Sequence, residues 1–222
     1  MMRRHLKHLA SRLMIPAVNW YLRRERAYRY GDIRVVVSPG VFHPGFFSST
    51  KFILSYLTHE DLAGRSVLEL GCGSGLIAVA AAKMKAHVTA TDINPLALTN
   101  TARNAVLNHV ALDLFLSDLF EKIPSQTFDW IIVNPPYYPR TPKTDAEKAW
   151  FCGENFEYFH RFFSSLRSRL HGQTQVIMVL TKGCDLTTIF SIAHAEGFSF
   201  ELLREKSVLF DEKDFLYRIV PH

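Results

Sequence analysis

The sequence predicts an α/β fold in which a mainly parallel sheet carries helices on both faces. Strand-like and helix-like segments alternate from residue 66 to residue 196, and such alternation is typical of parallel sheets. A glycine-rich turn at 71–75 joins the first of these strands to the first helix. The chain ends in two strand-like stretches around a polar turn at 211–214, which predicts a terminal antiparallel hairpin.

The elements follow a regular order along the chain. Residues 28–37 alternate weakly and predict an extended segment, which a turn at 38–40 ends. The serines and threonine at 48–50 are good helix caps and predict that a helix begins there. Four prolines between 135 and 148 predict a loop. Strands are expected at 66–70, 87–92, 112–118, 130–134, 175–180, 198–210 and 215–220, and helices at 76–86, 95–108, 149–170 and 186–196.

The charge of the chain is concentrated near its start. Residues 1–30 carry eight Arg or Lys residues and one Glu, a formal charge of +7, whereas the whole chain carries +5. We therefore expect a basic helical arm with a short strand extension at 1–45 and the main domain at 46–222. This helix can contact RNA, the ribosome or another anionic surface through residues 1–30, or pack on the domain with its charges in water. Its apolar residues recur at helical spacing: Leu6, Leu9, Ala10, Leu13, Met14 and Ala17.

Composition excludes several classes of protein. The chain has 222 residues, 48% of them hydrophobic and 21% charged, as in an ordinary globular protein. No apolar run approaches the roughly 20 residues that cross a bilayer, so no membrane partner is expected. Cys72, Cys152 and Cys184 are far apart and lack a CxxC pair, which argues against a disulfide framework or a metal site. A cytoplasmic location is expected.

The glycine-rich turn predicts a site for a cationic nucleoside. Gly71, Gly73 and Gly75 let the backbone turn tightly and approach a ligand. A dinucleotide fingerprint needs its third glycine at the sixth position, where this chain has Leu76. Glu69, two residues before the turn, would repel a pyrophosphate but suits a cation with ribose hydroxyls and an ammonium group.

Two further acids end the next two predicted strands. Asp92, followed by Ile93, can accept hydrogen bonds from both hydroxyls of a ribose. Asp118 can accept a hydrogen bond from an adenine amino group. Both acids could instead cap the helices that follow. Three acids around a glycine turn favour S-adenosylmethionine over a phosphate ligand.

The motif Asn134-Pro135-Pro136-Tyr137 predicts a site for a planar nitrogen. The lone pair of an amide or an aromatic amine is delocalised and poorly nucleophilic. The side-chain carbonyl of Asn134 and the backbone carbonyl of Pro135 can accept its two N–H groups and turn the lone pair toward a methyl donor. The prolines fix φ, and Tyr137 can pack against a planar substrate. Taken alone, the motif also fits a strand-ending turn, and the Pro135–Pro136 bond could be cis or trans.

Together these motifs resemble the class I S-adenosylmethionine-dependent methyltransferases, which have a seven-stranded Rossmann-like fold. In particular they resemble the HemK-type release-factor glutamine methyltransferases, over roughly residues 41–181. That group methylates the glutamine amide in the GGQ loop of peptide release factors, and some relatives methylate protein lysine. The resemblance implies a methyltransferase domain at 46–222 with Asn134, Pro135 and Tyr137 as catalytic residues. It implies that the cofactor contacts are Glu69, Gly71, Gly73, Gly75, Asp92, Ile93, Asp118 and Asn134.

The resemblance predicts the reaction more firmly than the acceptor. Phe46 and Phe47 replace acidic residues of that group, and of the glycines around Trp150 only Gly153 remains. The same tetrapeptide occurs in enzymes that methylate the exocyclic amine of adenine. We therefore expect transfer to a protein glutamine of release-factor type, with an adenine amine in structured RNA or DNA as the alternative. A cofactor-binding scaffold without catalysis is a third hypothesis.

Overall fold

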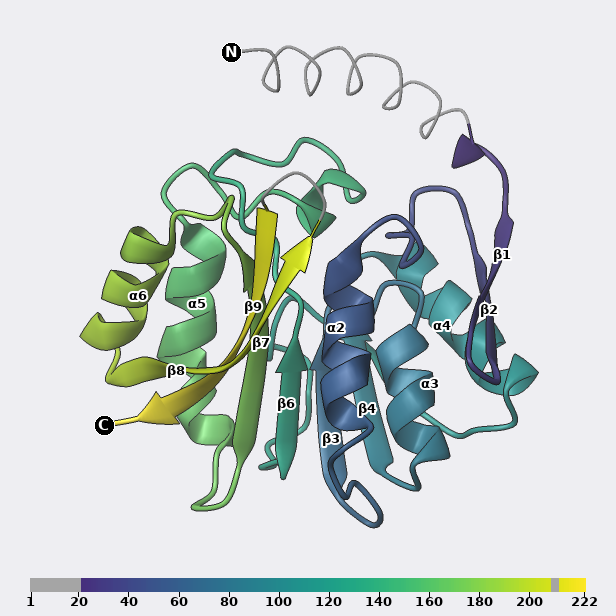
Figure 1. Ribbon diagram of the computed structural model, residues 1–222, viewed down its shortest axis with the longest axis horizontal. Helices are drawn as coiled ribbons and strands as arrows, with labels where there is room; N and C mark the ends of the chain where they lie inside the picture. The colour runs from purple at the N-terminus through teal and green to yellow at the C-terminus, as the bar shows by residue number, and fades with distance from the viewer. Residues whose placement is uncertain (1–20, 209–211) are drawn as a thin grey trace.

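The computed structural model describes residues 21–208 and 212–222. Its centre is a seven-stranded sheet with the order β5-β4-β3-β6-β7-β9-β8 (Figure 1). Strands β5 to β7 run parallel, whereas β9 is antiparallel to both β7 and β8. The predicted mainly parallel sheet and its terminal hairpin are therefore confirmed. The predicted basic helix lies outside the described residues.

The observed elements follow the predicted order. The sheet consists of β3 (Ser66–Leu70), β4 (His87–Asp92), β5 (Asp113–Leu116), β6 (Trp130–Val133), β7 (Gln175–Thr181), β8 (Phe198–Val208) and β9 (Glu212–Pro221). The helices are α2 (Ser48–Leu57), α3 (Leu76–Lys83), α4 (Pro95–Leu107), α5 (Glu157–Leu166) and α6 (Leu186–Ala195), with short 3-10 turns η1 (Glu147–Ala149) and η2 (Arg167–Arg169). A separate two-stranded hairpin contains β1 (Arg26–Tyr30) and β2 (Ile33–Val37).

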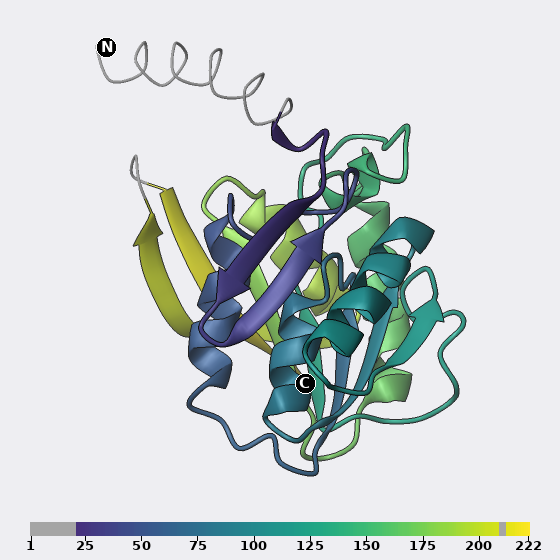
Figure 2. The same ribbon diagram turned by 90° about the vertical axis from the view of Figure 1, so that its right-hand side faces the viewer.

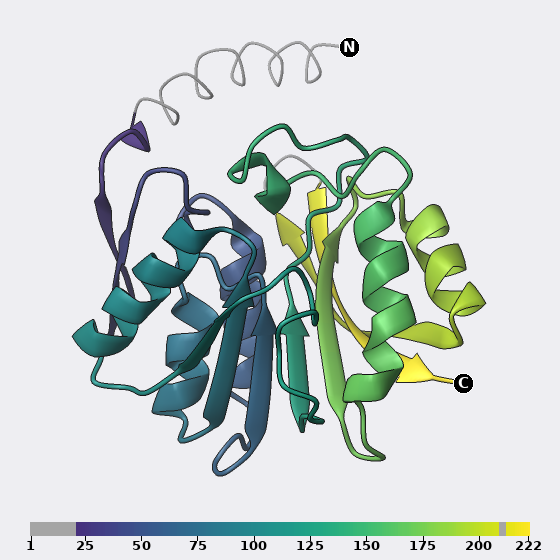
Figure 3. The same ribbon diagram turned by 180° about the vertical axis from the view of Figure 1, so that it is seen from behind.

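Two hydrophobic cores cover the two faces of the sheet. Successive residues of a strand point to opposite faces. In β7, Ile177 and Val179 join the core formed with α2 and α3, whereas Val176, Met178 and Leu180 join the core formed with α5 and α6. Figures 1 and 3 show α2 and α3 on one side of the sheet and α5 and α6 on the other. In the residues that the structure describes, no helix is long and apolar enough to cross a bilayer.

Three local expectations were wrong. The extended segment at 28–37 is a hairpin because Gly31 turns the chain with φ +59°. Helix α2 begins at Ser48, but Phe47 occupies its cap position without a side-chain hydrogen bond, since the Ser48 hydroxyl donates to Asp214 instead. The helix expected at 149–170 begins only at Glu157. Trp150, Cys152 and Gly153 instead hydrogen-bond to the loop after β6.

Three asparagines, two in α4 and one at its C-cap, hold the hairpin in place. Asn100, Asn104 and Asn108 lie on one face of the helix, four residues apart. Their Oδ1 atoms accept hydrogen bonds of 2.7–3.0 Å from alternate backbone N–H groups of Arg34, Val36 and Ser38. Their Nδ2 groups donate back to the carbonyls of Val36 and Arg34. Figure 2 shows the hairpin outside the main sheet. The segment leaving β2 is therefore fixed relative to α4, while the predicted domain boundary at residue 45 stays a prediction.

Replacing Asn104 with alanine should destabilise the protein strongly. Asn104 is fully buried and joins three backbone groups, the N–H and carbonyl of Val36 and the carbonyl of Ser74. Unsatisfied buried polar groups cost about 1–3 kcal/mol each, so we expect the free energy of unfolding to fall by about 3 kcal/mol in chemical denaturation. The neighbouring Arg103→Ala, which removes an exposed ion pair with Glu25, should cost less than about 1 kcal/mol. Equal losses for the two variants would contradict this role of Asn104.

Candidate active site

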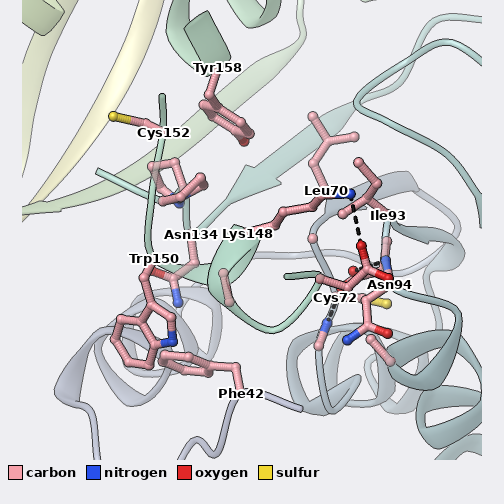
Figure 4. A pocket seen from close by; sticks show the side chains of 18 of the residues that line it. Phe42, Leu70, Cys72, Ile93, Asn94, Asn134, Lys148, Trp150, Cys152 and Tyr158 are labelled. Carbon is pink, nitrogen blue, oxygen red and sulfur yellow. Dashed lines mark hydrogen bonds and ion pairs between the residues drawn. The ribbon is translucent and has the colours of Figure 1, made fainter. Parts of the chain in front are cut away.

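A cavity of about 410 Å³ opens at the carboxyl ends of β3, β4 and β6. Its volume is within the range of about 300–1,000 Å³ typical of small-molecule sites. Every residue predicted for the site lines it except Gly75. Figure 4 shows two sides: Leu70, Cys72, Ile93 and Asn94 on one, and Asn134, Trp150 and Phe42 on the other, with Lys148 between them. The arrangement suits a ligand that spans from the glycine turn to the Asn134 motif.

The glycine turn is held open by backbone geometry and by α4. Gly71, Gly73 and Gly75 have φ between +54° and +74°, a region that residues with a Cβ rarely adopt. Thr101 of α4 is fully buried, and its hydroxyl donates to the carbonyl of Gly73 at 3.1 Å. Gly75 lies away from the cavity at the start of α3, where a Cβ would come within 2.6 Å of Thr101 Cγ2.

Asp92 connects the glycine turn to the end of β4. Its Oδ2 accepts from the N–H of Gly73 and its Oδ1 from the N–H of Asn94, both at 2.9 Å. Burial raises the pKa of this carboxyl above its ordinary value, although the backbone hydrogen bonds oppose the shift. Each oxygen retains capacity for another donor, so Asp92 can accept from two ligand hydroxyls. It does not cap α4, since Asn94 occupies that position.

Glu69 is a buried acid beneath the same turn. Its Oε2 accepts from the N–H of Ala78 in α3 at 2.7 Å, which holds the helix against β3. Burial is the main cause that raises the pKa of Glu69 well above its ordinary value, and the nearby Asp92 raises it further. A cation in the cavity favours the ionised forms of both acids, so the pair suits a positively charged ligand.

Asp118 lies at the far end of the cavity in an ion pair. Its Oδ2 is 2.8 Å from Nη1 of Arg161 on α5, and Nη2 of Arg161 is 2.7 Å from Glu121. Arg161 also lines the cavity, beside Tyr158. The guanidinium leaves other lone pairs of Asp118 for a ligand amino group, and it fixes where the carboxylate lies.

The Asn134 motif ends β6 on the opposite side of the cavity. Nδ2 of Asn134 donates to the hydroxyl of Ser49 at 3.2 Å. The N–H groups of Tyr137 and Tyr138 both donate to the carbonyl of Trp150, at 3.2 and 3.0 Å. No peptide bond among the described residues is cis, so the Pro135–Pro136 bond is trans. These bonds fix the motif between α2 and the segment at 149–153.

Three aromatic rings form a wall beside Asn134. Phe42, Phe47 and Trp150, here called the aromatic wall, line the cavity with ring centroids 4.7–5.3 Å apart. Phe42 also packs over Gly73. Phe47 thus forms part of the pocket wall, whereas Phe46 is exposed and contacts Tyr21 and His43. A flat group that enters beside Asn134 meets this wall.

The proline-rich loop after the motif contributes to the cavity as well. Thr141, Pro142, Asp145 and Lys148 line it, and Nζ of Lys148 is 2.8 Å from Asp145. Hydrogen bonds from Cys152 to Tyr138 and from Gly153 to Arg140 close the base of this loop. The predicted loop therefore forms part of the wall of the site.

Several residues of the site were missed from sequence. Ser49 was assigned only to a helix cap. Thr101, which supports the glycine turn, and Tyr158, which lines the cavity near the start of α5, lie within helices and carried no signal. Arg161 was not predicted as a site residue, yet it is exposed and pairs with Asp118. Trp150 was noted only through the family resemblance.

Comparisons with known proteins identify the family of this fold and site. Residues 32–191 match the family described as methyltransferase small domain. The chain belongs to this family. A Methanocaldococcus jannaschii relative that bears the name "Putative protein N5-glutamine methyltransferase" is 41% identical over 188 residues, which cover 81% of this chain and 92% of the relative.

Another relative of this methyltransferase matches over a shorter stretch, and solved structures share its fold. The ribosomal protein L11 methyltransferase of Porphyromonas gingivalis is 37% identical over 46% of this chain but only 36% of its own length. Among solved structures, the Thermus thermophilus 16S rRNA N2 G1207 methyltransferase, in complex with AdoMet and guanosine, has a TM-score of 0.63 and 20% identity, covering 88% of this chain and 50% of its own. The E. cuniculi Mtq2-Trm112 complex has a TM-score of 0.61 and 20% identity, and the match covers 82% of this chain and 99% of that one. These two share the fold.

The residues present fit S-adenosylmethionine, the cofactor of this methyltransferase. Asp92 has two free acceptor positions for ribose hydroxyls, and the open space beside Gly71 lets a ligand approach the backbone. The buried acids Glu69 and Asp92 suit a cation, while a pyrophosphate would be repelled. When bound, the cofactor supplies an activated methyl group on a sulfonium.

Proposed function

We propose that this methyltransferase transfers the methyl group to a planar amide or amine nitrogen of the substrate, which Asn134 and Pro135 hold. The observation that carries the proposal is the position of Asn134 and the buried Pro135 at the end of β6, in the cavity that also contains Gly73 and Asp92. Both the side chain of Asn134 and the backbone of Pro135 offer a carbonyl oxygen. A nitrogen bearing two hydrogens is the group that two such acceptors hold.

The residues act mainly by alignment. The two carbonyls accept the N–H groups of the acceptor and turn its lone pair toward the methyl carbon. The nitrogen–carbon bond forms as the carbon–sulfur bond breaks, and the bond's electron pair stays on sulfur. The carbonyls stabilise the positive charge that develops on nitrogen. Neither is a strong base, so one N–H proton leaves to water.

Our first candidate for the acceptor is a protein glutamine of release-factor type. The Methanocaldococcus jannaschii relative supports it, because the similarity extends over 81% of this chain and 92% of that protein. The side-chain amide of glutamine has the two N–H groups that the site requires. The partner is then a protein that presents a glutamine in an exposed loop. The free cysteines suit a reducing cytoplasm, where such a partner is available.

The second candidate is the exocyclic amine of adenine in structured RNA, or in DNA. The aromatic wall favours it, since stacking a base on an aromatic ring is worth about 1–3 kcal/mol. The charge of +7 on residues 1–30 adds attraction to a phosphate backbone.

A labelling experiment distinguishes the two acceptors. The purified protein and methyl-tritiated S-adenosylmethionine are added to a lysate freed of endogenous cofactor, which is then divided between RNase and protease treatment. Label that resists RNase and is lost to protease supports the glutamine acceptor, and the labelled band identifies the protein. Label lost to RNase supports the adenine acceptor. If neither treated half of the lysate carries label although the cofactor binds to the protein, the proposed function is contradicted.

If RNA is the substrate, removing residues 1–24 should weaken RNA binding and flatten its salt dependence. The deletion removes six of the eight basic residues at 1–30. Each phosphate contact contributes about 0.7–0.9 to the slope of log affinity against log salt. Fluorescence anisotropy with labelled RNA at 50–200 mM salt, roughly the range over which this term is large, measures the slope. An unchanged slope would show that residues 1–24 do not contact the RNA. If the acceptor is instead a free protein, it should be methylated at a similar rate with or without these residues.

A further inference from the structure

The hydroxyl of Ser49 lies against the catalytic amide from a different element of the chain. Ser49 is the second residue of α2, is 8% exposed and lines the cavity. Its Oγ accepts the hydrogen bond from Nδ2 of Asn134 at 3.2 Å, across 85 positions of sequence. One end of the Asn134 amide is therefore already engaged by the protein.

In this structure the contact leaves the carbonyl end of the amide for the substrate. An asparagine amide is planar, with a donor and an acceptor on opposite sides of Cγ. With Nδ2 held by Ser49, Oδ1 is left to accept an N–H of the substrate. In the flipped orientation Nδ2 would face the acceptor nitrogen and donate to the lone pair that has to attack the methyl group. An uncontrolled flip would thus block the reaction.

We infer that Ser49 is a positioning residue that fixes Asn134 with its carbonyl toward the acceptor. The inference rests on the proposed transfer to nitrogen, and it holds for both acceptors, since a glutamine amide and an adenine amine each carry an N–H₂ group. It also narrows the acceptor class. A ring nitrogen without hydrogens offers nothing to a carbonyl held in this orientation.

Ser49 is itself held firmly. The adjacent Ser48 donates its hydroxyl to Asp214, a buried residue of β9. Helix α2 packs on both β7 and β9, and β7 pairs with β6, which carries Asn134 at its end. The hydroxyl and the amide are thus fixed to the same sheet, so their relative position does not depend on the covering loop at 141–149.

The test compares Ser49→Ala with Ser49→Thr, which keeps a hydroxyl. The assay uses methyl-tritiated S-adenosylmethionine with a purified peptide release factor and, in a second arm, cellular RNA. For Ser49→Ala we expect kcat to fall about tenfold, as the loss of one ordering hydrogen bond implies, with cofactor affinity within about twofold of wild type. Ser49→Thr should recover kcat to within about threefold. Ser55→Ala, on the same helix but away from the cavity, should leave kcat unchanged.

A second readout does not need an acceptor. The side-chain amide protons of Asn134, identified in an NMR spectrum by their loss in Asn134→Ala, should shift upfield in Ser49→Ala and stay in place in Ser55→Ala. Wild-type kcat together with an unmoved amide signal in Ser49→Ala would overturn the inference. A loss of kcat, cofactor affinity and thermal stability together in Ser49→Ala would also overturn the inference, because it would indicate that the serine has a purely structural role. A wild-type protein that methylates neither arm contradicts the proposed function instead, while the NMR readout still tests Ser49.

Discussion

Asn134→Ala is expected to abolish most methyl transfer while the cofactor still binds. The substitution removes one of the two carbonyls that orient the acceptor and stabilise its developing charge. Removing one such group in other enzymes lowers kcat about 10²–10³-fold, and we expect a loss of this size. Binding of S-adenosylmethionine, measured by calorimetry, should change less than about tenfold, because we propose that Asp92 and Glu69, across the cavity, hold the ribose and the ammonium group.

The matched control is Asn155→Ala. Asn155 is exposed and does not line the cavity, although its hydrogen-bond partner Glu157 does, so its removal should leave turnover and cofactor affinity close to wild type. If Asn134→Ala kept wild-type turnover, Asn134 would not hold the acceptor. The hypothesis of a scaffold without catalysis makes a different prediction, that the protein has no turnover to lose.

Asp92→Ala is expected to weaken cofactor binding at least about a hundredfold. We propose that the carboxylate accepts a hydrogen bond from each ribose hydroxyl, and hydrogen bonds to charged groups contribute about 1.5–3 kcal/mol each. The substitution also releases the N–H of Gly73, which Asp92 holds at 2.9 Å, so the glycine turn loses an anchor. Calorimetric titration with S-adenosylmethionine measures the effect. Asp113→Ala, an exposed acid at the amino end of β5, is the control and should bind as wild type.

Asp92 should also make the affinity for the cofactor depend on pH. Burial raises the pKa of Asp92, so this carboxyl takes up a proton at a higher pH than an ordinary aspartate does. We expect affinity for the cationic cofactor to decline as the pH falls toward this raised pKa. The stability of the cofactor-free protein should change in the opposite direction, because a folded-state pKa above the unfolded one means that the folded state binds more protons in that interval. Measuring the cofactor affinity of wild type and Asp92→Asn from neutral to acid pH tests this. The same pH dependence of affinity in both proteins would contradict it.

The sheet was predictable because its signals are local. Strands β3, β4 and β6 are short apolar runs, each followed by a glycine, acid or proline motif, so both their type and their ends can be identified from neighbouring residues. The helix at 149–170 was predicted too long for a related reason. Apolar residues at helical spacing continue before Glu157, but Trp150, Cys152 and Gly153 hydrogen-bond to the loop after β6. A pairing between separate segments of this kind leaves no trace in a local pattern.

The same distinction separates predicted from missed site residues. Gly73, Asp92 and Asn134 lie in motifs whose chemistry is apparent from adjacent residues. Ser49 and Arg161 act through contacts 85 and 43 positions away, and only the fold brings them together with Asn134 and Asp118. Residue type alone would assign the serine to a helix cap and the arginine to a helix surface.

The most direct test of the account determines the atom that receives the methyl group. The purified protein is incubated with methyl-labelled S-adenosylmethionine and its labelled acceptor is isolated, hydrolysed in acid and resolved by chromatography. Transfer to a glutamine amide predicts labelled methylamine, and transfer to adenine predicts label on the base at its exocyclic nitrogen. Both products carry the methyl group on nitrogen, and neither should form when the Asn134→Ala variant replaces the wild-type protein. Label released as methanol from an ester, or held on carbon, would contradict the assignment of the Asn134 site to nitrogen.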